Sequence, residues 1–185
     1  MIRYEPKSFK QRRPGNNGNW VWNLKGVEPV LYNLPALKGA SEVLIVEGEK
    51  DADNLKALGF TATCNPMGAR KWKDHYNAYL KDRDIVLIPD NDNEGKEHMT
   101  QVAMSLNGTA KRLRWLDLPG LPSKGDVSDF IAQYNDPQEA AERLSIMIEN
   151  AEPYQPPKKA TIEDIILPAC DFAVLDIPER TEYLS

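Results

Sequence analysis

The sequence predicts an α/β domain: a mainly parallel sheet of about four strands flanked by helices, with a small β-rich segment at the N-terminus. Three observations support this prediction. The runs Val43–Val46 and Ile85–Ile88 are apolar at every position, which is typical of strands buried on both faces of a parallel sheet. Stretches with a helical spacing of apolar residues separate these runs, and such an order requires crossover connections. The first 38 residues instead show the short alternation of hairpins.

Residues 1–40 form the first predicted segment, which is basic and hairpin-like. Trp20–Leu24 and Val30–Tyr32 alternate between apolar and polar side chains, and the turn-forming residues 16–19 come just before them. We therefore expect a small hairpin or meander preceded by a turn. The two tryptophans of the first stretch could stack on bases or fill a small core, and we expect the core, because tryptophans in strands usually pack.

Residues 41–150 form the second predicted domain, which contains the sheet. Strands are predicted at Val43–Val46, Phe60–Cys64, Asp84–Pro89 and Lys111–Leu116. Helices are predicted at Glu49–Leu58, Lys71–Leu80, Gly95–Leu106 and Asp136–Asn150, after a short helix or turn at Leu34–Leu37. A further short helix, capped by Asp126 or Ser128, is predicted to end near Tyr134. Their apolar residues recur every three or four positions. Gly59 suits the end of the first long helix, and Asp136 before Pro137 suits the start of the last one.

Residues 151–185 form the third predicted part. Pro153–Pro157 is expected to be a stiff, extended linker. A weakly helical stretch, Ile162–Leu167, and the segment Phe172–Pro178 follow it. The chain then ends without a helix-capping pattern, so we expect it to be a fragment of a longer protein.

The composition excludes several classes of protein. Of the 185 residues, 41% are apolar and 28% are charged, as in globular proteins that dissolve in water. No apolar run approaches the roughly 18 residues that a membrane helix needs, and the N-terminus lacks the apolar core of a signal peptide. We therefore expect a cytoplasmic protein with no membrane partner. Cys64 and Cys170 are too few for a zinc ribbon or a disulfide framework, and we expect Cys64 to be a buried thiol.

The charge is unevenly distributed along the chain. The net charge is -5, but residues 1–26 contain six Lys and Arg against one Glu. A basic arm beside an acidic body suits phosphate contact by the arm and metal binding by the body. A solvated arm without a ligand would have the same composition, so this pattern alone does not decide between the two.

Acidic residues follow three of the predicted strands. Glu47 follows the first, Asp90 and Asp92 follow the third, and Asp126 and Asp129 follow the loop after the fourth. The carboxyl ends of parallel strands lie at one edge of the sheet, so these acids can meet. Each of them alone could equally cap a helix or lie in a solvated turn. Together they would repel one another unless a hard cation lay among them, which predicts one or two Mg²⁺ ions.

Three acidic motifs in this order resemble the TOPRIM domain, the catalytic domain of bacterial-type primases, type IA and II topoisomerases and some nucleases. They are Val46–Ala52, Asp90–Gly95 and Gly125–Asp129, and the resemblance covers residues 41–150. Further stretches resemble the primase portion of phage and plasmid primase-helicases: Arg12–Gly15, Trp20–Leu24 and Asn65–Ala69. Leu175–Arg180 resembles the start of a RecA-like ATPase domain. The TOPRIM fold that the resemblance implies is a Rossmann-like α/β sheet.

The resemblance also implies roles. Glu47 would be the general base or acid that takes the proton from a primer 3′-hydroxyl. The residues that would hold Mg²⁺, with Mn²⁺ as a substitute, are Asp90, Asp92, Asp126, Asp51 and Asp129. Asp126 is the expected ligand of the third motif, and the alternatives Asp129 or both stay open. Basic residues at loop or helix starts near these acids, or in the arm, could bind phosphates or nucleic acid: Lys50, Arg70, Lys71, Lys96, Arg12 and Arg13. Each of these alone could equally be solvated surface.

These observations predict magnesium-dependent nucleotidyl transfer, as the primase portion of a DNA replication protein that synthesises RNA primers. Its partners would be a single-stranded DNA template and NTPs, with a helicase or ATPase domain on the same full-length chain. No GxxxxGK[ST] phosphate loop occurs in the sequence, so we expect any helicase activity to lie beyond Ser185. Two alternatives stay open: a metal-dependent nuclease of the same fold, and a non-catalytic nucleic-acid-binding module coupled to a helicase.

Overall fold

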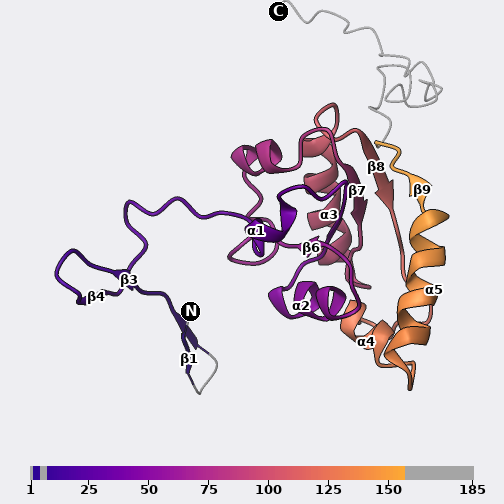
Figure 1. Cartoon of the computed structure of the whole chain (residues 1–185), viewed down its shortest axis with the longest axis horizontal. Coiled ribbons are helices and arrows are strands. Elements are labelled where there is room, and N and C mark those ends of the chain that lie inside the picture. The colour runs from indigo at the N-terminus through magenta and orange to yellow at the C-terminus, as the bar shows by residue number, and fades with distance from the viewer. Residues whose placement is uncertain (1, 5–7, 157–185) are drawn as a thin grey trace, which may run out of the picture. The chain divides into compact units, whose positions relative to one another are not determined.

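A computed structural model of the chain describes residues 2–4 and 8–156. Its centre is a five-stranded sheet in the order β6-β5-β7-β8-β9 (Figure 1). The strands are β5 (Glu42–Ile45), β6 (Ala62–Thr63), β7 (Asp84–Leu87), β8 (Arg112–Trp115) and β9 (Glu152–Pro153). The first four are parallel to their neighbours and β9 is antiparallel to β8. The predicted α/β class, with a mainly parallel sheet flanked by helices, is therefore confirmed. The predictions for Ile162–Leu167 and for the ATPase-like segment lie outside the described residues.

The fifth strand corrects the start of the predicted linker. Pro153 and Tyr154 do not begin a free extended segment, because Pro153 pairs with Arg114 at the edge of the sheet. An edge position tolerates proline, which has no N–H to donate to a neighbouring strand. The backbone N–H of Tyr154 donates to the Leu113 carbonyl at 2.9 Å, and its ring stacks on Trp115 with the centroids 6.0 Å apart. The described residues up to Tyr154 belong to one compact unit.

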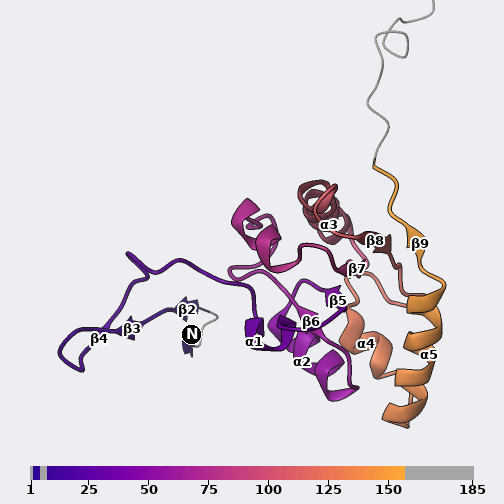
Figure 2. The ribbon, with the colours of Figure 1, turned by 45° about the horizontal axis from the view of Figure 1, so that its top comes forward.

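Helices cover both faces of the sheet. They are α1 (Leu34–Leu37), α2 (Glu49–Ala57), the 3₁₀ helix η1 (Asp74–Tyr79), α3 (Asn93–Leu106), α4 (Val127–Ile131) and α5 (Pro137–Glu149). Figure 2 shows α3 on one side of the sheet and α4 and α5 on the other. The α-helix predicted over Lys71–Leu80 is wrong in its first part, because Lys73 is extended and the 3₁₀ turns begin only at Asp74. None of the helices in the described ranges is long and apolar enough to cross a membrane.

The N-terminal segment contains two small antiparallel hairpins. β1 (Ile2–Tyr4) pairs with β2 (Ser8–Lys10), and β3 (Arg13–Pro14) pairs with β4 (Trp20–Val21). The predicted turn at residues 16–19 therefore joins β3 to β4. Val30–Tyr32, which alternates in sequence, is not a strand. Its Leu31 side chain is instead buried in the core of the main sheet.

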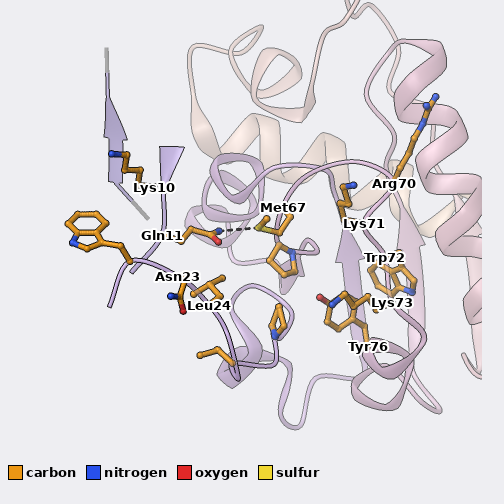
Figure 3. A pocket seen from close by; sticks show the side chains of 14 residues that line it. Lys10, Gln11, Asn23, Leu24, Met67, Arg70, Lys71, Trp72, Lys73 and Tyr76 are labelled. Atoms are coloured by element: carbon orange, nitrogen blue, oxygen red, sulfur yellow. Dashed lines mark hydrogen bonds between the residues drawn. The ribbon is translucent and has the colours of Figure 1, made fainter. Parts of the chain in front are cut away.

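The two arm tryptophans lie on the surface, so the expectation that they fill a core is wrong. Trp20 and Trp22 are each 51% exposed. The Arg12 guanidinium lies over both rings, 4.0 Å from the Trp20 centroid and 5.6 Å from the Trp22 centroid. The arm reaches the main domain through Gln11, whose side-chain N–H donates to the Met67 sulfur at 3.1 Å (Figure 3).

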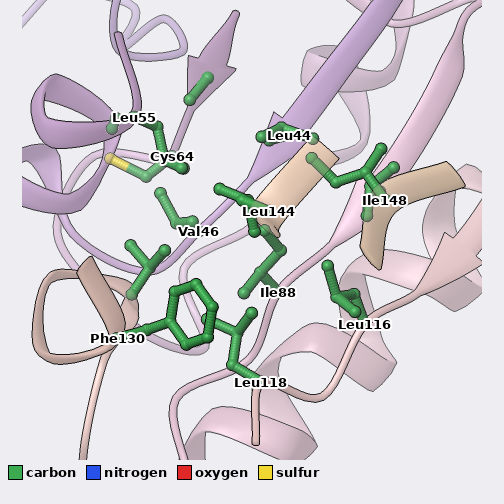
Figure 4. Close-up of a cluster of buried hydrophobic side chains, with 14 residues drawn as sticks. Leu44, Val46, Leu55, Cys64, Ile88, Leu116, Leu118, Phe130, Leu144 and Ile148 are labelled. Atoms are coloured by element: carbon green, nitrogen blue, oxygen red, sulfur yellow. The ribbon is translucent and has the colours of Figure 1, made fainter. Parts of the chain in front are cut away.

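The hydrophobic core has two layers because successive side chains of a strand point to opposite faces. On one face, Leu44, Val46, Val86 and Ile88 pack with buried side chains of α2, α4 and α5 (Figure 4). On the other, Val43, Ile45, Ile85 and Leu87 pack with buried side chains of α1, η1 and α3. Cys64 lies in the first layer, where burial raises the pKa of its thiol to about 12, so the prediction of a buried thiol is confirmed.

Candidate active site

The strand order places a topological switch point between β5 and β7. From β5 the chain crosses to β6 on one side, and it later returns to β7 on the other side of β5. The loops that follow β5 and β7 therefore diverge where the two strands end, and ligands of open α/β sheets bind at such points. Ile45 pairs with Leu87 in these strands, so Glu47 and Asp90 follow at nearly the same level.

Glu47 lies half-buried at this point, and one of its carboxylate oxygens has no partner. Among the described residues, no hydrogen bond reaches its Oε1, although that atom is buried. Burial raises the pKa of Glu47, and the carboxylate of Asp92 raises it further. A carboxyl group with a raised pKa takes up a proton more readily than an exposed one does.

Gly95 in the first turn of α3 allows the helix to approach this carboxylate. A Cβ atom at Gly95 would lie 2.4 Å from Glu47 Oε1 and 2.9 Å from the carbonyl oxygen of Asp90. Both distances are shorter than real Cβ contacts, so any larger residue would push the loop or the carboxylate away. The absence of a side chain at position 95 therefore keeps Glu47, Asp90 and the start of α3 in contact.

Asp90 and Asp92 follow β7 and differ in their surroundings. Burial raises the pKa of Asp90 to about 7, and the carboxylates of Glu47, Asp51, Asp126 and Asp92 contribute in that order. Asp92 is the N-cap of α3, and its Oδ1 accepts the backbone N–H of Gly95 at 2.7 Å. Asp90 is thus the acidic residue whose pKa is raised by all four of the other carboxylates.

Asn91, between these two aspartates, holds the third acidic motif in place. Its backbone N–H donates to the Gly125 carbonyl at 2.9 Å, and its carbonyl accepts the N–H of Lys124 at 3.0 Å. Its side-chain amide donates to the carbonyls of Leu121 and Pro122 at 3.0 and 2.9 Å. These four hydrogen bonds tie the loop before α4 to the loop after β7, which brings Asp126 towards Asp90.

The capping of α4 separates the two candidate acids of the third motif. Asp126 is the N-cap: its Oδ1 accepts the N–H of Asp129 at 2.8 Å, while Asp129 Oδ2 accepts the N–H of Asp126 at 3.1 Å. Asp126 is half-buried and raises the pKa of both Asp90 and Asp51. Asp129 is exposed and its carboxylate caps the backbone. Asp126 is therefore the acid that faces the cluster.

Asp51 on α2 is buried and hydrogen-bonded to α4. The Ser128 hydroxyl donates to Asp51 Oδ1 at 2.5 Å, and the Asn54 side-chain amide donates to the Ser128 oxygen at 2.7 Å. Burial raises the pKa of Asp51, and the hydrogen bond from Ser128 opposes that rise. These two hydrogen bonds join α2 to α4 next to Asp126. Sequence reasoning missed Ser128 and Asn91 as positioning residues, because their partners are distant in the sequence.

The predicted cations are spread over four places. Lys50 Nζ lies 4.0 Å from Asp126 Oδ2, at the acidic cluster. Lys96 Nζ lies 3.5 Å from Asp117 on the loop after β8. Lys71 lines a groove between the arm and the main domain, together with Arg70. Arg12 and Arg13 belong to the N-terminal hairpin, where Arg12 contacts the two tryptophans.

The donor set suits a hard divalent cation. Carboxylate oxygens are the ligands of Mg²⁺, and the buried Glu47 Oε1 has no hydrogen-bond partner among the described residues. Four carboxylates surround Asp90 and add to the rise in its pKa that burial causes. No group of three His, Cys, Asp or Glu side chains within the described part of the chain stands close enough to enclose a metal. Mg²⁺ usually binds through one or two carboxylates, and waters and substrate phosphates complete its coordination shell. A Mg²⁺ site therefore does not require an enclosing group of three side chains.

Comparisons with known proteins place the fold. No family model matches the chain. The gene 57 protein of Mycobacterium phage D29 is 35% identical over 101 residues, which are 54% of this chain and 66% of that protein. Among solved structures, the DnaG primase catalytic domain bound to single-stranded DNA matches with a TM-score of 0.51 and 19% identity, over 66% of this chain and 39% of that one.

A second structure is that of the bacteriophage T7 lagging-strand DNA polymerase interacting with primase domains of two gp4 subunits bound to an RNA/DNA hybrid and dTTP. One of its chains matches with a TM-score of 0.54 and 18% identity, over 78% of this chain and 72% of that one. The chain described here thus spans 66% of the phage D29 protein, 39% of the DnaG structure and 72% of the matched T7 chain. It has the α/β fold of primase-type catalytic cores.

Proposed function

We propose that this chain is the catalytic portion of a phage-type DNA primase, which joins ribonucleotides on a single-stranded DNA template in a magnesium-dependent reaction. The observation that carries the proposal is the unpaired, half-buried Glu47 carboxylate beside Asp90 at the switch point of the sheet. The fold that the chain shares with primase catalytic cores supports the proposal. The 35% sequence identity to the gene 57 protein of Mycobacterium phage D29 supports the phage-type part of it. A helicase or ATPase domain on the full-length chain belongs to the same proposal.

Each residue has a role that follows from its surroundings. Glu47, whose pKa is raised by burial, accepts the proton of the primer 3′-hydroxyl. Asp90 and Asp92 would hold Mg²⁺ or Mn²⁺, with Asp126 as the further acid. When bound, the cation neutralises charge on the incoming triphosphate. Lys50, which is exposed beside Asp126, is placed to contact a phosphate.

Asp51 and Asp129 have a different role in this proposal. Asp51 accepts a hydrogen bond from Ser128 inside the protein, and Asp129 caps the backbone of α4. Both therefore position the loop that carries Asp126. Their loss would weaken the site through the geometry of α2 and α4.

The test is primer synthesis by the full-length protein from NTPs on single-stranded DNA. Glu47→Gln should lower the yield at least about 100-fold, since a positioned general base contributes at least that factor. Asp90→Asn should lower the yield as well, because it removes a proposed ligand of the cation that neutralises the triphosphate. Glu139→Gln, on the exposed first turn of α5, is the matched control and should keep full activity. An unchanged yield in both site variants would exclude the assignment. Degradation of DNA with Mg²⁺ and without NTPs would assign a nuclease.

A further inference from the structure

Three buried polar atoms at the carboxyl end of the sheet lack a hydrogen-bond partner among the residues that the structure describes. They are Glu47 Oε1, Asn65 Oδ1 and His98 Nε2. The Asn65 side chain is buried and His98 is fully buried. A buried polar atom without a partner is costly, so each of these atoms needs an explanation. The proposed function uses only Glu47.

The sheet places Glu47 beside Asn65. In the paired strands β5 and β6, the backbone N–H of Val46 donates to the Thr63 carbonyl at 3.0 Å, so Val46 lies next to Cys64. Both of these side chains point into the core layer that α2, α4 and α5 cover. Because side chains alternate along a strand, Glu47 and Asn65 point to the opposite face, which α3 covers.

Helix α3 brings His98 to the same place. Gly95 lies against Glu47, and His98 follows one turn later on the same buried side of the helix. The loop after β6 closes the space from another side. The Asn65 side-chain amide donates to a carbonyl of this loop at 2.8 Å, and the backbone N–H of Arg70 donates to His98 Nδ1 at 3.0 Å. The sheet, α3 and the loop therefore bound the space that holds the three unpaired atoms.

The hydrogen bond from Arg70 decides which ring nitrogen of His98 carries the proton. Nδ1 accepts the Arg70 N–H, so Nδ1 is unprotonated. Burial lowers the pKa of His98, which keeps the ring neutral and leaves its proton on Nε2. The orientation of the Asn65 amide is fixed as well, because its NH₂ group donates to the carbonyls of Pro66 and Gly68. The three unpaired atoms are thus one N–H donor and two oxygen acceptors.

The occupant of this space must accept one hydrogen bond and donate two. A metal ion cannot accept the N–H of His98, and an anion cannot donate to the oxygens of Glu47 and Asn65. A water molecule does both, since it has two O–H groups and two lone pairs. We propose that Glu47, Asn65 and His98 bind one buried water molecule, and that His98 acts through this water as a positioning residue for Glu47.

The water restrains the Glu47 carboxylate. Because Oε1 accepts a hydrogen bond from the water, the carboxylate keeps one orientation and its other oxygen is left to accept the proton of the substrate hydroxyl. This positioning role rests on the proposed function, in which Glu47 is the base. The water site itself does not, because it follows from the donor and the acceptors alone.

Two variants of the full-length protein separate the two nitrogens of His98. In His98→Asn, the side-chain carbonyl replaces Nδ1 as the acceptor for Arg70, but no donor reaches the water. In His98→Gln, the longer amide replaces Nε2 as the donor, and the acceptor for Arg70 is lost. His98→Asn should lower kcat for primer synthesis about tenfold with an unchanged KM for NTPs, because a hydrogen bond in a chain that ends on a charged group is lost. His98→Gln should keep kcat close to that of the wild type, while hydrogen exchange at the Arg70 amide becomes faster.

The comparison of the two variants decides between positioning and a merely structural role. Equal losses of kcat in both would refute the proposal, because they would show that His98 only holds the loop or fills space under α3. An unchanged kcat in His98→Asn would refute it as well. The control is His75→Asn, which changes the other histidine of the chain and should leave kcat unchanged.

A high-resolution crystal structure of the wild-type protein tests the water site without any assay of activity. The expected result is a water oxygen within about 3 Å of Glu47 Oε1, Asn65 Oδ1 and His98 Nε2. Any other arrangement of the three atoms, such as direct contact between them or a metal ion among them, would overturn the proposal. If the water is present and the wild type makes no primers from NTPs, the proposed function fails and the water site stands.

Discussion

Asp90 offers a sharp test of the acidic cluster, because the protein without metal should be destabilised by its charge. Burial and four neighbouring carboxylates raise its pKa from 3.8 to about 7. The folded state therefore binds more protons than the unfolded chain between these two values, and stability falls as pH rises through this window. Asp90→Asn removes the charge. The variant should be more stable than the wild type at pH 8 in EDTA.

The size of this effect follows from the pKa. At about 1.4 kcal/mol for each factor of ten, a pKa raised from 3.8 to about 7 corresponds to an upper limit of about 4 kcal/mol. The Asp90 side chain is partly exposed and solvent screens its neighbours, so we expect about 2 kcal/mol. For a chain of this length that is an increase in Tm of about 4 to 8 °C.

Thermal unfolding followed by circular dichroism between pH 4 and pH 8 measures the effect. The difference in Tm between Asp90→Asn and the wild type should be small at pH 4, where the wild-type carboxyl is protonated, and large at pH 8. Added Mg²⁺ should reverse the order, because a cation bound at 100 times its Kd stabilises the wild type by about 2.7 kcal/mol. Asp82→Asn, at an exposed position, is the control. The same pH dependence in wild type and Asp90→Asn would refute the reasoning.

Three further predictions concern the residues that shape the site. Gly95→Ala should lower primer synthesis at least about tenfold, because the added Cβ would collide with Glu47 Oε1. It should also weaken Mn²⁺ binding measured by calorimetry, and unchanged binding would contradict the close approach of α3 to Glu47. Asn91→Ala should lower the free energy of unfolding by about 1 to 2 kcal/mol in urea titrations, since two side-chain hydrogen bonds to the loop before α4 are lost. Ser128→Ala should raise the pKa of Asp51 further, which titration by NMR would detect as an upward shift of the carboxyl resonance midpoint.

Much of the fold could be predicted from the sequence because its signals are local. The strands β5 and β7 appear as uninterrupted apolar runs, and helices α2, α3 and α5 appear as periodic stretches with capping residues at their ends. Acidic residues directly after parallel strands are also visible in sequence. Their position at one edge then follows from the direction of the strands.

Contacts between distant residues decided the rest. The pairing of β9 with β8 involves two residues on each strand, too few for a pattern, and it depends on where α5 ends. Trp20 and Trp22 were expected in a core because tryptophans in strands usually pack. They are exposed instead, since strand alternation does not say whether a second layer covers the strand. The helix expected from Lys71 begins later because the backbone of Arg70 is held by His98 on α3.

The sequence by itself determined the sheet and the acids that follow its strands, because burial of a parallel strand and the chemistry of carboxylates are properties of neighbouring residues. The tertiary structure alone decided that Asp126, the N-cap of α4, also faces Asp90 while Asp129 lies exposed, since Asn91 holds the intervening loop. It also decided that Lys71 and Trp22, about fifty positions apart, line one groove. Such juxtapositions depend on the packing of whole elements, which no local pattern encodes.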